Sequence, residues 1–167
     1  MPTNLEIVRA TYEGGSAEVN GRNLLAALAP EAEWTEAAGF PYAGTYVGPQ
    51  AIFKNVHQRL GTEWQGYRAD VEHFYDAGEN VIAQGFYHGT YGATGKSFTA
   101  SFAHIYQLRE GKIVKFTQIV DSAKVLEAMA RLKATVLAVF TIVFPPVAAR
   151  LVAIADPQIA AHQRDGA

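Results

Sequence analysis

The sequence contains no cysteine among its 167 residues. This absence excludes disulfide bonds, thiolate metal sites and thiol nucleophiles. Charge of either sign is also scarce: charged residues make up 18% of the chain, and 14 Lys and Arg against 16 Asp and Glu give a net charge of −2. No broad basic surface is therefore expected to attract nucleic acid or an anionic membrane. The balance favours a small, uncharged or weakly charged partner.

Targeting and membrane-spanning segments are also lacking. The chain starts MPTNLEIV, without a basic stretch followed by an apolar one, so we expect a cytoplasmic protein. One uncharged run, 134–144, has 11 residues and ends at Pro145-Pro146, which is short of the roughly 20 residues that span a bilayer. We expect residues 134–155 to form an apolar helical segment that packs on this protein or on a second copy, and the rest of 134–167 to be a polar tail.

Aromatic and aliphatic residues, in contrast, are plentiful. Hydrophobic types make up 49% of the chain and include 9 Phe and 8 Tyr, which is enough to build a folded core and too apolar for a disordered chain. The length predicts one domain, here residues 1–133.

Helical periodicity dominates the first part of that domain. Thr3 and Glu6 form a capping-box pattern, and Pro49 follows Gly48 as a first helical residue. Apolar spacing predicts helices over about 4–17, 21–28, 49–61 and 123–133.

A period of two replaces this pattern from Tyr67 onward. Alternation predicts strands over about 67–77, 81–91, 97–109 and 112–120, joined by short turns, with an earlier strand at 32–36 and an aromatic loop at 37–47. Helices followed by an antiparallel meander predict an α+β fold, with the helices packed on one face of a curved sheet.

Turn lengths then predict which side chains share a face of the sheet. A two-residue turn at Glu110-Gly111 places Gln118 opposite Ala103, and a three-residue loop at 93–95 places Ala103 opposite Gly85. Small residues on this face (Gly85, Gly89, Ser101 and Ala103) predict a hollow rather than a filled core.

The opposite face collects large side chains: Phe86, His88, Phe98, Phe102, His104, Tyr106, Leu108, Ile113 and Ile119. An apolar patch over three strands exceeds what soluble monomers usually expose, so either a second subunit or the apolar C-terminal segment should cover it. A homodimer through this outer face is the simpler expectation.

The order of these segments, with HIYQLREGKIVKF and REGKIVKFTQIVD near the end, resembles the SnoaL-like branch of the nuclear transport factor 2-like superfamily over about residues 4–130. The resemblance implies a cone-shaped α+β barrel with one deep pocket and, in many members, a dimer. Members include ketosteroid isomerases, polyketide cyclases, limonene epoxide hydrolases and binding proteins without catalysis.

Position matching with the isomerases implies Tyr12 as an oxyanion donor and Glu36, 24 residues later, as the base. The isomerase's second donor matches Ala103, which has no acidic group. In the epoxide hydrolases the water-activating aspartate matches Gln118, and the Arg-x-Asp pair matches residues 85–87. Neither complete catalytic set is therefore present.

Four residues are candidate catalytic groups, each with a plainer interpretation. Glu36 could be a base if apolar walls raise its pKa, or an exposed carboxylate. Tyr12 could polarise a substrate oxygen or be a core tyrosine. Gln118 could bind a ligand oxygen or a water. Asp121 could be a pocket acid, although its place before a helix favours an N-cap.

The predicted wall of the pocket consists of Trp34, Tyr46, Phe53, His57, Tyr87, Ala103, Phe116 and Val120. No carboxylate and histidine cluster has metal-ligand spacing, and no phosphate-binding loop is present, so no metal or cofactor is expected. Two functions remain open. One is a cofactor-independent isomerase or cyclase that removes a proton from a hydrophobic cyclic carbonyl compound. The other is a non-catalytic protein that binds a small hydrophobic ligand.

Overall fold

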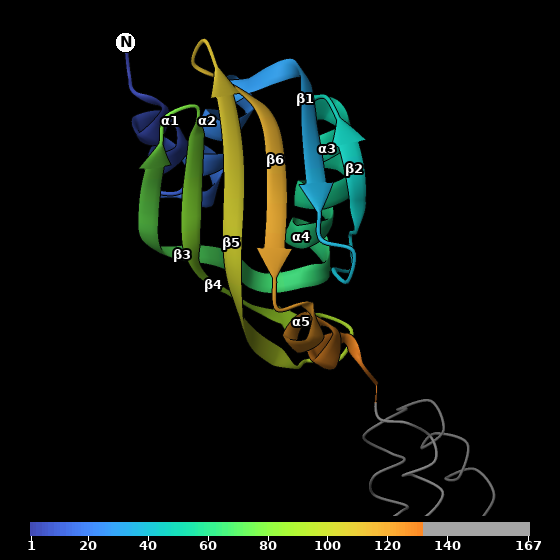
Figure 1. Cartoon of the computed structure of the whole chain (residues 1–167). Helices are drawn as coiled ribbons and strands as arrows, with labels where there is room; N and C mark the ends of the chain where they lie inside the picture. Colours follow the sequence, from blue (N-terminus) through green and yellow to red (C-terminus); the bar gives the residue numbers. More distant parts are fainter. Residues whose placement is uncertain (132–167) are drawn as a thin grey trace, which may run out of the picture. The chain divides into compact units, whose positions relative to one another are not determined.

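One curved sheet organises the fold. A computed structural model of the chain describes residues 1–131, so the predicted apolar segment and polar tail lie outside the described residues. Within the described part, six strands follow one another in the order β2-β1-β6-β5-β4-β3 without closing into a ring. They are β1 (Leu28–Glu36), β2 (Gly44–Val47), β3 (Trp64–Ala77), β4 (Asn80–Tyr91), β5 (Ser97–Arg109) and β6 (Lys112–Val120) (Figure 1).

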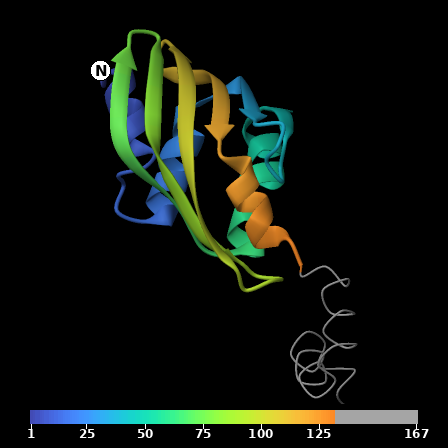
Figure 2. The same ribbon diagram turned by 60° about the horizontal axis from the view of Figure 1, so that its bottom comes forward.

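The helices cover the inner face of this sheet. They are α1 (Asn4–Ala10), α2 (Ala17–Ala27), α3 (Pro49–Ile52), a π-helical turn η1 (Phe53–His57), α4 (Gln58–Glu63) and α5 (Ser122–Met129). The predicted capping box of Thr3 and Glu6 begins α1, and Gly48-Pro49 begins α3. Two views show α1, α2 and the α3 to α4 segment on the same side of the strands (Figures 1 and 2).

The predicted α+β fold is therefore confirmed, with three differences in detail. The sheet is mixed, because β1 pairs with β6 in parallel while the other neighbours are antiparallel. The segment 37–47, expected to be a loop, contains the short strand β2, and the first helix ends at Ala10 rather than near Ala17.

The hairpin between β5 and β6 begins as predicted. Glu110 and Gly111 both have positive φ, 49° and 73°, as a two-residue turn that matches strand twist requires, and Arg109 lies opposite Lys112. Beyond Leu108 the register shifts, and Gln107 pairs with Lys115. The residue between Ile113 and Lys115 is thus the extra residue of a β-bulge.

The turn between β4 and β5 is also one residue longer than predicted. The Tyr91 N–H donates to the Lys96 carbonyl, so Tyr91 rather than Gly92 lies opposite Lys96. Because side chains alternate between faces, this shift and the bulge place the side chains of β5 on the opposite face of the sheet from the one predicted. His104 pairs with Gln118, and Ala103 pairs with Ile119 on the outer face.

Two predictions about the faces are therefore wrong. Small residues do not form the hollow, because Ser101 and Ala103 point outward. A Cβ at Gly85 would lie 2.0 Å from the Asp70 carbonyl oxygen, so this glycine allows β3 to approach β4 closely beside the bulge in β3. Six of the nine residues assigned to the outer face are instead buried, namely Phe98, Phe102, His104, Tyr106, Leu108 and Ile113.

The outer face keeps Phe86 (37% exposed), Ile119 (56% exposed) and the half-buried His88. The predicted patch of nine residues is therefore not present on this face. The half-buried Ile82, Ala103 and Ile105 share the face with these three instead, and a dimer stays a prediction.

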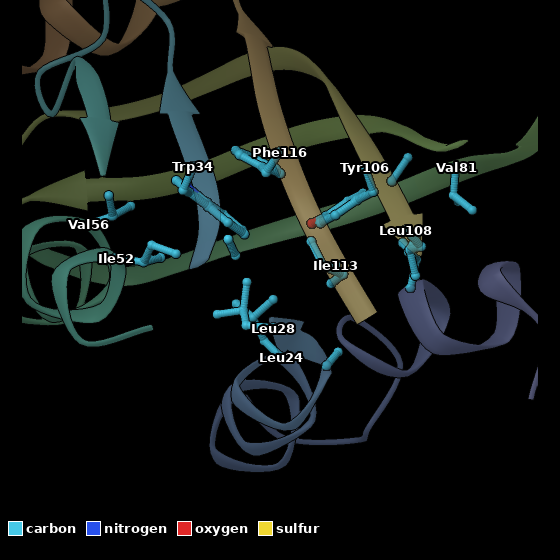
Figure 3. Close-up of a cluster of buried hydrophobic side chains, with 14 residues drawn as sticks. Leu24, Leu28, Trp34, Ile52, Val56, Val81, Tyr106, Leu108, Ile113 and Phe116 are labelled. Carbon is cyan, nitrogen blue, oxygen red and sulfur yellow. The ribbon is translucent and has the colours of Figure 1, made fainter. Parts of the chain in front are cut away.

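Two clusters of buried side chains fill the space between sheet and helices. The first joins α1, α2, β1, η1 and the inner faces of β4 to β6, and ten of its residues are labelled in Figure 3. The second is mostly aromatic, with Phe40, Tyr42, Trp64, Tyr87, Phe98 and Phe102, and α5 closes it with Val125 and Ala128. Phe40 and Tyr42 of the segment 37–47 thus pack into this second cluster, whereas Tyr46 packs against the first.

Candidate functional site

A cavity of about 880 Å³ lies between the inner face of the sheet and the helices. Its lining comes from α2, β1, the α3 to α4 segment, β3, β4, β5 and β6. The polar and aromatic side chains of this lining include Tyr12, Trp34, Glu36, His57, Tyr67, Tyr87, His104, Tyr106, Phe116 and Gln118. The predicted pocket is present, and large aromatic side chains rather than small ones form its wall.

Glu36, the last residue of β1, contributes an ionisable carboxyl to the cavity. The residue is 4% exposed, and its Oε1 accepts a 2.7 Å hydrogen bond from the Trp34 indole N–H. Its Oε2 is buried and has no hydrogen-bond partner within residues 1–131. Burial raises the pKa of Glu36 to about 7, against the opposing effect of the Trp34 hydrogen bond, which is the range in which a carboxylate can act as a base at neutral pH.

Trp34 forms the wall beside this carboxyl. Its ring stacks on Phe116, with centroids 3.6 Å apart and an interplanar angle of 12°, because the two residues are partners in the parallel β1 to β6 ladder. The His57 ring meets Trp34 edge-on at 5.5 Å. Glu36 therefore sits in a rigid, mostly apolar setting that restricts water around its carboxyl.

His57 ends the π-helical turn η1, a rare geometry that is frequent at functional sites. Its Nε2 is buried and has no hydrogen-bond partner in the described chain. Burial lowers the pKa of His57 to about 4, so the ring is neutral at physiological pH and can bind a ligand through one donor and one acceptor nitrogen.

A chain of hydrogen bonds crosses the cavity beside Glu36. The Tyr12 hydroxyl lies 2.5 Å from the Tyr106 hydroxyl and 2.5 Å from His104 Nδ1, and His104 Nε2 is hydrogen-bonded to the Tyr87 hydroxyl. Burial lowers the pKa of His104 to about 3 and raises the pKa values of the three tyrosines well above their usual range. All four groups are therefore neutral at physiological pH.

Gln118 joins this chain to the strand that carries Glu36. Its Oε1 accepts from the backbone N–H of Ala37 at 3.1 Å, and its Nε2 donates to the Tyr87 hydroxyl at 3.1 Å. A backbone N–H can only donate, so the contact with Ala37 determines which end of the amide faces Tyr87.

The structure brings together most of the residues selected from the sequence. Glu36, Tyr12 and Gln118 all line the cavity, as do the predicted wall residues Trp34, Phe53, His57, Tyr87 and Phe116. Phe53 is 48% exposed, so it lies where the cavity opens rather than deep inside.

Four predicted site residues do not line this cavity. Ala103 faces outward because of the register shift. Asp121 is exposed directly before α5. The Tyr46 hydroxyl donates to the Tyr42 carbonyl, away from the cavity. Val120 lines a separate depression along β1, β2 and β6, because the last residues of β6 lie past the cavity wall.

The sequence patterns did not single out His104, Tyr106 or Tyr67 as pocket residues, although all three line the cavity. The first two were assigned to the outer face from turn lengths. Their alternation with Phe102 and Leu108 was the better signal, because the face with the large apolar side chains is the one a sheet buries. The resemblance matched the isomerase's second donor to Ala103, and the neighbouring residue His104 is the one that lies on the inner face.

Neither a metal site nor a membrane span is found in the described chain. Within residues 1–131, no group of three His, Asp or Glu side chains could hold a metal ion. None of the helices in this range has the length and apolar character needed to cross a bilayer.

Comparison with solved structures gives close matches over most of the chain. An NTF2-like protein from Burkholderia thailandensis E264 is 44% identical, with a TM-score of 0.74 over 78% of this chain and 100% of that one. An NTF2-like protein of unknown function from Burkholderia pseudomallei K96243 is 26% identical, with a TM-score of 0.69 and the same coverage. TerC, co-crystallized with polyporic acid, is 25% identical, with a TM-score of 0.66 over 75% of this chain and 97% of that one.

A search of curated proteins found no match. The SnoaL-like domain family, in contrast, matches residues 8–116, a range that contains Tyr12, Glu36, His57, Tyr87, His104 and the rest of the cavity wall up to Phe116. This chain therefore belongs to the SnoaL-like domain family.

Proposed function

We propose that this protein is a cofactor-independent isomerase or cyclase that acts on a hydrophobic cyclic carbonyl compound, with Glu36 as the general base. The observation that carries the proposal is Glu36, a cavity-lining residue whose buried Oε2 has no hydrogen-bond partner among the described residues. Leaving such an atom unpaired is costly, and a ligand in the cavity would relieve that cost.

The proposed reaction begins with proton transfer. The Glu36 carboxylate takes a proton from the carbon next to the carbonyl, and the electron pair of the broken C–H bond forms an enolate. In an isomerisation, Glu36 returns the proton to another carbon. In a cyclisation, the enolate carbon forms a bond to a second carbonyl carbon, whose oxygen receives the proton.

The neutral chain beside Glu36 supplies hydrogen bonds for the enolate oxygen. Burial raises the pKa values of Tyr12 and Tyr87, so both hydroxyls stay protonated and can donate at neutral pH. Preorganised donors in a site with little water are worth more than the same donors in solution.

The cavity wall and the relatives support a small organic ligand. Trp34, Phe116 and Tyr87 present aromatic surface to the cavity, which suits a flat or cyclic hydrophobic compound. The similar protein TerC was crystallised with polyporic acid, and membership of the SnoaL-like family is consistent with chemistry of the cyclase or isomerase type.

Deuterium exchange tests the base. In D₂O, the wild-type protein should accelerate exchange of the hydrogens next to the carbonyl of 2-tetralone, a bicyclic ketone, as followed by proton NMR. Glu36→Gln should lower this rate by about 10²- to 10⁴-fold and leave binding of the ketone nearly unchanged. Glu33→Gln, on the exposed side of the same strand, is the matched control and should behave like the wild type.

Ligand binding without catalysis is the second candidate. The observation that favours it is that Tyr12, Tyr106, His104, Tyr87 and Gln118 already satisfy one another, as suits a cavity for a mostly apolar guest. If the wild-type protein binds 2-tetralone but exchanges its hydrogens no faster than buffer does, the base proposal fails and this candidate is favoured.

A further inference from the structure

The hydrogen atoms of the chain that crosses the cavity can be counted. Tyr106, Tyr12 and Tyr87 each carry one hydroxyl hydrogen, and neutral His104 carries one ring hydrogen. Three hydrogen bonds join these four groups in the order Tyr106, Tyr12, His104, Tyr87. Four hydrogens serve three bonds, so one hydrogen is left over for a partner outside the chain.

The tautomer of His104 determines where that extra hydrogen can lie. With the hydrogen on Nδ1, His104 donates to Tyr12 and accepts from Tyr87, which leaves the extra hydrogen on Tyr12 or Tyr106. With the hydrogen on Nε2, His104 donates to Tyr87 and accepts from Tyr12, which leaves the extra hydrogen on Tyr87. Only one of the three tyrosines in this hydrogen-bonded chain can therefore donate to a ligand at a time.

The neighbours of Tyr87 favour the second arrangement when a ligand oxygen is bound. Gln118 donates to the Tyr87 oxygen and accepts from the backbone N–H of Ala37, the residue directly after Glu36, so Tyr87 is the chain member connected by hydrogen bonds to the end of β1 that carries Glu36. A carbonyl oxygen and the hydrogen removed by the base are only one carbon apart. The donor to that oxygen must therefore lie on the Glu36 side of the chain.

We infer that His104 is a positioning residue whose Nε2–H tautomer directs the one extra hydrogen of the chain through Tyr87 to the oxygen of a bound enolate or phenolate. Tyr87, rather than Tyr12, is then the donor that touches the ligand. This inference deepens the proposed function and rests on it for the identity of the ligand. The experiment that tests it measures ligand binding and does not require catalytic turnover.

The test uses 2-naphthol, whose phenolic oxygen stands for the enolate oxygen. Protein labelled with ¹⁵N in histidine is titrated with 2-naphthol, and long-range proton–nitrogen spectra report which ring nitrogen of His104 carries the hydrogen. His104→Gln, which lacks the signal, assigns it. The bound protein should show His104 neutral with the hydrogen on Nε2. A bound state with the hydrogen on Nδ1, or with both nitrogens protonated, would overturn the inference.

Matched hydroxyl deletions give a second readout that does not depend on the histidine variant. Tyr87→Phe should weaken 2-naphthol binding by about tenfold, as expected for a lost hydrogen bond in a buried site, and should remove the preference for Nε2–H. Tyr12→Phe should weaken binding less than Tyr87→Phe. Tyr46→Phe, whose hydroxyl bonds to backbone outside the cavity, should change nothing. A larger loss from Tyr12→Phe than from Tyr87→Phe would assign the donor to Tyr12.

The two proposals can fail separately. If Glu36→Gln keeps full exchange activity while His104 shows the Nε2–H tautomer with 2-naphthol, the assignment of Glu36 as the base is wrong and the inference about His104 stands. If Glu36→Gln abolishes exchange while His104 shows Nδ1–H, the inference about His104 is wrong and the assignment of Glu36 stands.

Discussion

Strand β5 carries two regions that differ in what they contribute. At one end, Leu108 packs with Val8, Val81 and Ile113 in a group that we call the aliphatic end; these four residues are at most 1% exposed, and none of them lines the cavity. Two and four residues earlier on the same face lie Tyr106 and His104, which belong to the hydrogen-bonded chain of the cavity.

One end of β5 thus contributes to the stability of the fold, and the residues further along it contribute to the binding site. Aliphatic side chains gain free energy by leaving water and need no specific partner. Buried hydroxyl and imidazole groups must find hydrogen bonds to offset their desolvation, and they favour one arrangement over others without adding much net stability. The aliphatic end should therefore determine whether the protein folds, and the polar chain what it binds.

Truncation of the aliphatic end should have the largest effect on stability. Leu108→Ala removes a buried side chain and leaves a cavity, so we expect the free energy of unfolding to fall by about 2–5 kcal/mol. Denaturant unfolding would measure this loss. Where enough folded protein remains, its affinity for 2-naphthol should stay within about threefold of the wild-type value. A large loss of affinity in the folded fraction would show that the two regions are not separate.

Replacement of Glu36 should make the protein more stable at high pH. The unfolded carboxyl ionises near pH 4.5 and the folded one near pH 7, so between these values the folded state holds a proton that the unfolded state has lost. Stability should therefore fall as the pH rises through this range, by about 3 kcal/mol in total. The Glu36→Gln variant lacks this loss.

Chemical unfolding of wild type and Glu36→Gln at pH 4.5 and pH 8 measures that difference. The variant should gain about 3 kcal/mol relative to wild type between the two pH values, whereas Glu33→Gln should track the wild type. Equal pH dependence in wild type and Glu36→Gln would mean that Glu36 is not held in its neutral form by burial.

The rate of the proposed reaction should follow the ionisation of Glu36. Only the carboxylate can accept a proton, so kcat/KM for exchange should fall by about tenfold for each pH unit below 7 and level off above it. His57 and His104, with pKa values of about 4 and 3, stay neutral and add no further break above about pH 5. A profile that falls with rising pH would contradict the assignment of Glu36 as a base.

Loss of the helix cap should give the smallest effect. Thr3→Ala removes the side-chain acceptor for the Glu6 N–H at the start of α1 and should cost about 1 kcal/mol, measurable as a small fall in Tm. Thr3→Ser keeps the hydroxyl and serves as the control. Because α1 lies at the surface beside the aliphatic end, neither change should alter 2-naphthol binding, and an effect on binding would show that α1 controls the position of Tyr12.

The sequence predicted the elements of the fold and part of the site for local reasons. Periodicity located β5 and β6 with their observed bounds, and the Glu110-Gly111 pair identified a tight turn. The sequence made Trp34 a predicted wall residue and Glu36 a candidate base, and the structure joins the two by a hydrogen bond. Each of these features depends on residues close together in the chain.

The register of the sheet could not be predicted in the same way. Turn lengths assigned Ala103 to the inner face and His104 to the outer one, and both assignments are wrong because one bulge and one longer turn each shift the pairing by a single residue. The large inward side chains of β5 carried the better signal, since burial of an apolar face outweighs the preference of a short turn.

Local sequence thus determined the helices, the strands, the tight hairpin turn and the Glu36 and Trp34 pair, because propensity and alternation act over a few residues. Only the tertiary structure decided that His104 lies between Tyr12 and Tyr87 and that Glu36 lines a cavity with one carboxyl oxygen lacking a partner in the described chain. These contacts join residues up to 92 positions apart, and the packing of the whole sheet against its helices sets them.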